Sequence, residues 1–148
     1  MKTFKEIILF AMQHEDEEAA YYESLAHRSS STDQKNALLA HAEEERNHKR
    51  HLQKILENGN LPSGPHIVPD VDMKLVETLT VSPSQSGEIS FEEALIMAAK
   101  REKAAEQFYR SLAQEAQDPG LQETLIFLAD QEARHAGQLE REYDDGQP

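Results

Sequence analysis

Cysteine is absent from the 148-residue sequence. This absence excludes disulfides, thiolate metal sites, iron–sulfur clusters and thiol catalysis, so any bound metal must be held by oxygen and nitrogen donors. Glycine and proline are scarce, at six residues each, and no apolar run is long enough to span a bilayer. With 38% hydrophobic and 29% charged residues, the chain has the composition of one globular domain with a single core.

Basic residues are too few to balance the acidic ones. The sequence has 15 lysines and arginines against 28 aspartates and glutamates, which gives a formal net charge of -13. Such a surface repels nucleic acid and anionic membranes, so we expect neither as a partner, whereas metal cations suit it. The first residues contain no signal-peptide cleavage site, and acidic residues follow their short apolar stretch at once, so we expect a cytoplasmic protein.

The sequence repeats itself at an offset of 87 residues. The segment ILFAMQHEDEEAAYYESLA, which starts at Ile8, aligns without a gap to LIMAAKREKAAEQFYRSLA, which starts at Leu95. The same offset pairs Phe4 with Phe91, Ala11 with Ala98, Glu15 with Glu102, Tyr22 with Tyr109, Glu45 with Glu132 and His48 with His135. Each half of the chain is therefore one copy of the same structural unit.

Each copy has the pattern of two helices joined by a turn. Apolar residues return every three or four positions, as amphipathic helices require, and each copy opens on a capping-box pattern. These patterns are Thr3 with Glu6 and Ser90 with Glu93. Turn residues lie near the centre of each copy, at 29–31 and 118–120. The predicted helices cover residues 3–28, 32–58, 90–117 and 119–143.

The segment 59–89 between the two hairpins, 3–58 and 90–143, is rich in proline, glycine and serine. We interpret it as a crossover, with a helix stop at Gly59 and a short helix near residues 70–79. A connection of this length is unusual in a compact domain, but bundles of ferritin type contain one. A flexible linker between separate hairpins is the alternative, although it would leave both apolar faces in water. We therefore predict an all-α, ferritin-like four-helix bundle that forms a single domain.

Glutamate stands three residues before histidine only twice in the sequence, and the two occurrences match across the repeat. Residues three apart on a helix face the same side, so a carboxylate and an imidazole can converge on one ion. A further glutamate on the first helix of each copy lies level with these pairs, because residues equidistant from the turn of a hairpin lie at the same height. The predicted metal ligands are Glu15, Glu45, His48, Glu102, Glu132 and His135.

A single glutamate on a helix is usually a solvated surface charge. Here each predicted ligand lies within an apolar stripe, as Glu15 does with Ile8, Ala11 and Tyr22. Buried carboxylates would repel one another, whereas two divalent cations neutralise their charge. Four carboxylates with two imidazoles form the donor set of di-iron and di-manganese bundles. We expect two iron ions, with manganese or zinc as alternatives.

Other histidines and one glutamate need separate interpretations. Glu18 and His41 fall near the level of the predicted ligands, and we interpret each as a neighbour of the ligands or as a solvated residue. The remaining histidines have no matching histidine in the other copy, so we expect them at the surface. They are His14, His27, His51 and His66.

These motifs resemble those of the rubrerythrin branch of the ferritin-like superfamily. The resemblance covers both hairpins and rests on Glu15 with Tyr22, the run AEEERNH that ends at His48, Glu102 with Tyr109, and the run DQEARH that ends at His135. It implies a carboxylate-bridged di-iron centre. It also implies that Tyr22 and Tyr109 donate hydrogen bonds to ligand carboxylates.

The sequence departs from typical rubrerythrins in two ways. They carry a rubredoxin segment with four cysteines that feeds electrons to the iron, and these 148 residues contain no cysteine, so a separate donor is required. They also place an extra ligand glutamate three residues after the one on the third helix. Ala105 occupies that position here, and its repeat mate, Glu18, is the candidate to supply this ligand from the first helix.

Our leading functional hypothesis is a di-iron oxidoreductase in which two ferrous ions, about 3.5 to 4 Å apart, reduce peroxide or dioxygen. A second hypothesis is iron binding, buffering or storage without catalysis. A third is a purely structural bundle that docks to a partner. We also expect a homodimer, with the apolar residues of segment 70–79 at its interface.

Overall fold

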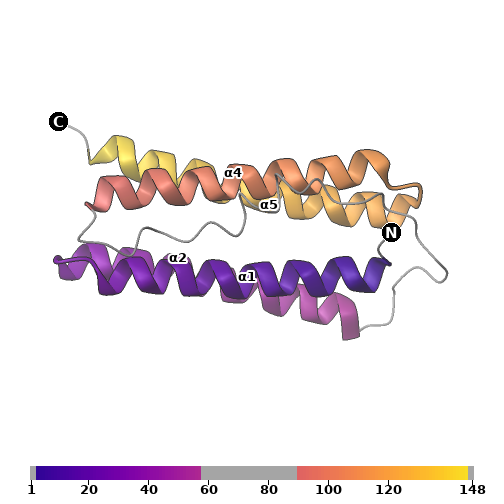
Figure 1. Ribbon diagram of the computed structural model, residues 1–148, viewed down its shortest axis with the longest axis horizontal. Helices are drawn as coiled ribbons and strands as arrows, with labels where there is room; N and C mark the ends of the chain where they lie inside the picture. Colours follow the sequence, from indigo (N-terminus) through magenta and orange to yellow (C-terminus); the bar gives the residue numbers. More distant parts are fainter. Residues whose placement is uncertain (1–2, 58–89, 147–148) are drawn as a thin grey trace. The chain divides into compact units, whose positions relative to one another are not determined.

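Four helices make up nearly all of the chain that the computed structural model describes, residues 3–57 and 90–146. They are α1 (Phe4–His27), α2 (Thr32–Glu57), α4 (Phe91–Glu115) and α5 (Pro119–Asp145), coloured along the chain in Figure 1. Each predicted helix is present and begins and ends within two residues of its predicted limits. The predicted crossover, with its stop at Gly59 and its short helix, lies outside the described residues, as does the segment expected at a dimer interface.

The described residues divide into two compact units, each centred on one helical hairpin. The first unit contains residues 5–57, which include nearly all of α1 and α2, together with the first turn of α4. The second contains the remainder of α4 and all of α5. We call the α1–α2 pair hairpin 1 and the α4–α5 pair hairpin 2. The single-domain assignment of residues 1–148 stays a prediction.

Side-chain caps fix where three of the helices begin. Asp118 Oδ1 accepts a hydrogen bond of 2.9 Å from the backbone N–H of Leu121, and Pro119 occupies the first turn of α5, where a missing N–H does no harm. Ser90 Oγ accepts in the same way from the N–H of Glu93 at 3.1 Å. Ser31 Oγ caps α2 by accepting from Gln34 at 3.4 Å. These caps place the turns of both hairpins where the sequence predicts them.

The apolar stripes predicted from the sequence form the buried faces of the helices. In hairpin 1 the largest fully buried aliphatic side chains are Ile7, Ile8, Leu25, Leu38 and Leu52. In hairpin 2 they are Leu95, Leu121, Leu125 and Leu139. Phe91, the repeat mate of the buried Phe4, is an exception because it is only half-buried. No helix within residues 3–57 and 90–146 is long and apolar enough to cross a membrane.

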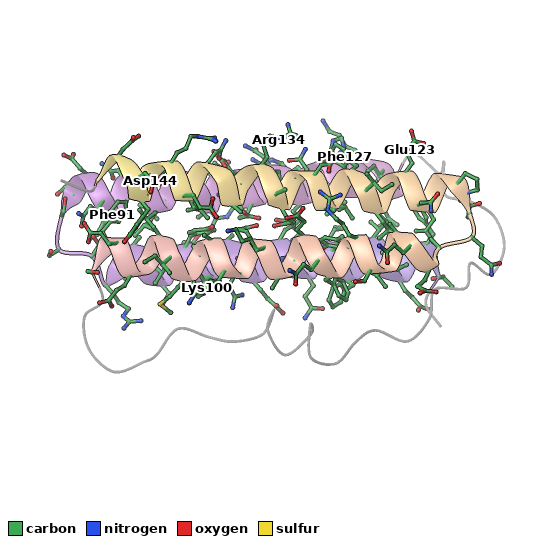
Figure 2. The ribbon with its side chains drawn as sticks, turned by 90° about the horizontal axis from the view of Figure 1, so that it is seen from above. Phe91, Lys100, Glu123, Phe127, Arg134 and Asp144 are labelled. Atoms are coloured by element: carbon green, nitrogen blue, oxygen red, sulfur yellow. The ribbon has the colours of Figure 1, made fainter. Side chains whose placement is uncertain are left out.

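Ion pairs join the two helices of each hairpin on their outer surface. In hairpin 1, Lys49 Nζ lies 2.6 Å from Asp16 Oδ2. In hairpin 2, Arg110 lies 3.0 Å from Asp130 and 2.8 Å from Glu106, and hydrogen bonds to both carboxylates raise the pKa of its guanidinium. Figure 2 shows other charged and apolar side chains of α5, among them Glu123 and Phe127, on the side that faces away from α4.

Gly137 interrupts the interior of α5 without any packing requirement for glycine. A Cβ atom at this position would lie 3.5 Å from Arg141 Nη1, an ordinary contact with the end of a flexible side chain. Glycine inside a helix costs about 0.5–1 kcal/mol relative to alanine. We therefore expect Gly137→Ala to raise the free energy of unfolding in urea by about that amount.

Gly146 provides the matched control, because it follows the end of α5 and gains nothing from helix propensity. The Gly146→Ala variant should unfold at nearly the same urea concentration as the unsubstituted chain. A loss of stability in Gly137→Ala would contradict the regular helix described around this residue.

Candidate metal centre

Three donor atoms converge within hairpin 1. Carboxylate oxygens of Glu15 and Glu45 and an imidazole nitrogen of His48 all lie within 4.8 Å of one another. His48 Nδ1 lies 3.6 Å from Glu15 Oε2 and 3.7 Å from Glu45 Oε2. Two donors that each lie about 2.1 Å from one ion are at most about 4.2 Å apart, so these separations fit shared coordination.

Helix geometry explains why these three side chains meet. Glu45 and His48 are one turn apart on α2, and so they project from the same side of that helix. Glu15 comes from the middle of α1, which runs antiparallel to α2 and contacts it through the ion pair between Asp16 and Lys49. The carboxylates of Glu15 and Glu45 are 1% and 0% exposed, whereas the His48 side chain is 22% exposed. The donor set is thus buried on its carboxylate side.

Hairpin 2 repeats part of this arrangement. His135 Nδ1 lies 3.2 Å from Glu102 Oε1, which joins α5 to α4 at the positions that match His48 and Glu15. Glu132 is buried one turn before His135 on α5. The structure therefore brings Glu102 and His135 together and buries Glu132 on the adjacent turn. All six predicted ligands lie at matched positions of the two hairpins.

The donor set fits iron. Carboxylate oxygen and imidazole nitrogen are ligands that iron and manganese accept, and no softer donor is available because the sequence lacks cysteine. Buried carboxylates are costly unless a positive charge compensates them, and a divalent cation supplies it. The chemistry of the residues thus agrees with a metal of charge two or more.

The two tyrosines expected beside the centre are fully buried. Tyr22 stacks on the imidazole of His41, with ring centroids 5.3 Å apart and an interplanar angle of 26°. Each tyrosine also meets the preceding aromatic ring edge-on, with ring centroids 6.1 Å apart for Tyr21 and Tyr22 and 5.4 Å apart for Phe108 and Tyr109. The repeat mate of His41 is Leu128, so hairpin 2 has no imidazole at the corresponding position. The surroundings of the two tyrosines therefore differ although the tyrosines themselves match.

The prediction that His14 lies at the surface is wrong. His14 is only 2% exposed, and its repeat mate, Arg101, is also buried. Both extend the buried face beyond the predicted stripe. In α1 this second buried row contains Ile7 and Glu18 and shares Ala11 with the stripe. The recurrence of these positions every three or four residues was a signal that could have identified them.

Three further expectations have mixed outcomes. Glu18 and His41 are buried, so the solvated interpretation of these two residues is wrong. His27 and His51 are exposed, as expected. His66 lies outside the described residues. The buried polar set of hairpin 1 is therefore larger than the sequence pattern indicated.

Comparison with known proteins identifies the family. Residues 6–143 match the model of the family described as rubrerythrin. The chain belongs to the rubrerythrin family. Membership of this family implies iron binding, in agreement with the donor set of Glu15, Glu45 and His48. No curated protein matches the sequence.

Two solved structures share the fold of this rubrerythrin-family chain. One is a hypothetical protein from Pyrococcus furiosus, with a TM-score of 0.62 at 23% identity, covering 96% of this chain and 89% of that chain. The other, from Thermotoga maritima, is named provisionally as a ferritin-like diiron-carboxylate protein. It has a TM-score of 0.63 at 21% identity and covers 99% of this chain and 97% of that chain. The predicted ferritin-like four-helix bundle is confirmed by these likenesses.

Metal binding should stabilise this rubrerythrin-family chain. A metal that binds only the folded state at a concentration of 100 times its Kd adds about 2.7 kcal/mol of stability. We expect anaerobic ferrous iron to raise Tm, measured by circular dichroism, and a chelator to reverse the rise. Glu45→Gln should lose most of this rise, while its metal-free form should be at least as stable as the unsubstituted chain because the amide carries no buried charge.

Glu43→Gln is the matched control, because Glu43 is exposed on the same helix two residues before Glu45. This variant should keep the full metal-dependent rise in Tm. Equal rises in both variants would show that the metal binds to surface carboxylates rather than to the buried donors.

Proposed function

We propose that this chain is a di-iron oxidoreductase that reduces peroxide or dioxygen with electrons from a separate donor. The observation that carries the proposal is the convergence of Glu15, Glu45 and His48 within 4.8 Å. The contact between Glu102 and His135 at the matched positions of hairpin 2 supports it. In this proposal the iron ligands are Glu15, Glu45, His48, Glu102, Glu132 and His135.

The bound iron pair would supply the two electrons that, with two protons, convert one peroxide to two waters. The protein residues hold and orient the ligands. Tyr22 and Tyr109, both fully buried, are proposed to donate hydrogen bonds to ligand carboxylates and so keep them in one rotamer. The stack between Tyr22 and His41 restrains the tyrosine ring.

Glu18 is the proposed further carboxylate of the centre. It is buried one turn after Glu15 on α1, so both side chains project from the same side of that helix. Ala105, the repeat mate of Glu18 on α4, offers no ligand atom. In the proposed centre α1 therefore contributes two carboxylates, whereas α4 contributes one.

The lack of cysteine supports the proposal of a separate electron donor. With no cysteine in these 148 residues, the chain cannot hold a rubredoxin-type iron site or an iron–sulfur cluster of its own. A formal charge of -13 favours a donor with a basic contact surface, because opposite charges speed the encounter.

Iron binding or storage without turnover is the second candidate. The observation that favours it is Ala105, which stands where the resemblance to rubrerythrins places an extra ligand glutamate. The two candidates differ in stoichiometry and turnover. Catalysis requires two irons per chain and repeated oxidation, whereas storage requires many irons retained per chain.

The test is single-turnover oxidation. The chain is loaded anaerobically with two ferrous ions and mixed with peroxide, and ferric absorbance is followed by stopped flow. Glu132→Gln should slow the oxidation by about 100-fold, because it removes a proposed ligand, and Tyr22→Phe by about 10-fold, because it removes a hydrogen bond to a ligand. With a chemical reductant present, the unsubstituted chain should complete many turnovers.

Glu123→Gln is the control for Glu132→Gln, since Glu123 is exposed on the same helix and points away from α4 (Figure 2). Its oxidation rate should equal that of the unsubstituted chain. Slow oxidation in every form, or retention of many irons per chain, would reject the enzyme and support storage.

A further inference from the structure

The two matched histidines differ in their access to solvent. The side chain of His48 is 22% exposed, whereas that of His135 is 2% exposed. The carboxylates of Glu15 and Glu45 beside His48 are buried. The donor set of hairpin 1 therefore reaches solvent through the imidazole of His48.

The residues that follow Glu15 and His48 in the sequence form an ion pair with each other. Asp16 follows Glu15 on α1, and Lys49 follows His48 on α2, so the contact from Asp16 to Lys49 runs alongside the one from Glu15 to His48. The two charged side chains are 54% and 34% exposed, and Lys49 Nζ lies 2.6 Å from Asp16 Oδ2. We call this pair the outer bridge.

Hairpin 2 has the opposite charge at one of these two positions and no charge at the other. The repeat mate of Asp16 is Lys103, and the mate of Lys49 is Ala136. Lys103 forms its ion pair with Glu140, one turn further along α5. Hairpin 1 thus presents an exposed carboxylate next to its ligand glutamate, whereas hairpin 2 presents an ammonium group there.

We propose that metal ions enter the centre past His48, and that the outer bridge sets the rate of entry. The proposal rests on the metal centre proposed above. Exposed ion pairs are weak, so the bridge between Asp16 and Lys49 opens often. When it is open, the Asp16 carboxylate receives the hydrated cation and passes it to Glu15. Lys49 slows entry in two ways. Its positive charge repels the cation, and its ion pair with Asp16 keeps that carboxylate from binding the cation while the bridge is closed.

Substitution of the two residues of the outer bridge should change the rate of metal entry in opposite directions. Lys49→Met exposes Asp16 and removes the repelling charge, so we expect Co²⁺ to enter the metal-free chain about fivefold faster. Asp16→Asn removes the receiving carboxylate, so entry should be about fivefold slower even though the bridge is lost. Lys49→Arg keeps both the charge and the pair, and its rate should stay close to that of the unsubstituted chain. Stopped-flow absorbance of the bound Co²⁺ measures the rate.

Opposite changes in the entry rate for Lys49→Met and Asp16→Asn distinguish a role in metal entry from a purely structural role. If the ion pair only stabilised the hairpin, both substitutions would shift the rate in the same direction. The difference between the two variants should also shrink at about 0.5 M salt, where charges on the surface are screened.

Lys103→Met is the matched control, because it removes the same charge from the mate of Asp16, beside the buried His135. Its entry rate should match that of the unsubstituted chain within about twofold. The route past His48 is overturned if this control accelerates entry as much as Lys49→Met does, or if Lys49→Met and Asp16→Asn change the rate in the same direction or leave it unchanged. Failure of the unsubstituted chain to bind Co²⁺ or ferrous iron would instead overturn the metal centre, and the route with it.

Discussion

Burying a carboxylate costs several kcal/mol of hydration unless a positive charge compensates it. The described residues of this chain include five glutamates that are exposed by 1% or less: Glu15, Glu18, Glu45, Glu102 and Glu132. Each lies on a helix whose buried residues are mostly apolar, and the free energy of burying those apolar residues offsets the cost of the buried carboxylates. Cation binding is the arrangement that removes this cost. The proposed function follows from this requirement for a cation.

Most of the fold was predictable because its signals are local. Helix starts depend on caps such as Asp118 and Ser90, which act on backbone groups only three residues away. The burial of the four glutamates among the candidate ligands was predictable from the internal repeat, because a rare spacing that occurs twice at one offset is unlike the pattern of surface glutamates. Comparison of the two copies therefore gave the kind of information that an alignment of two related sequences provides.

The remainder was not predictable because a periodic pattern marks the centre of a buried face but not its width. His14 and Glu18 lie beside the apolar stripe of α1, and only the packing of neighbouring side chains decides that such positions are buried. The half-buried Phe91 shows the reverse case, since its mate Phe4 is buried although the two positions match in the repeat. Matching sequence positions therefore indicate the same helix face but not the same environment.

The duplicated hairpin also has a consequence for how such a centre arises. Because one hairpin already holds a carboxylate from each helix and an imidazole, a half-length ancestor that paired with an identical copy would have carried the full set of donors. After fusion of two such copies, each half could change at positions that an identical pair must keep the same. The two halves do differ at matched positions: Leu128 stands at the position of His41, and Lys103 at that of Asp16. A duplicated site can in this way specialise its halves, with one imidazole 22% exposed and its mate 2% exposed.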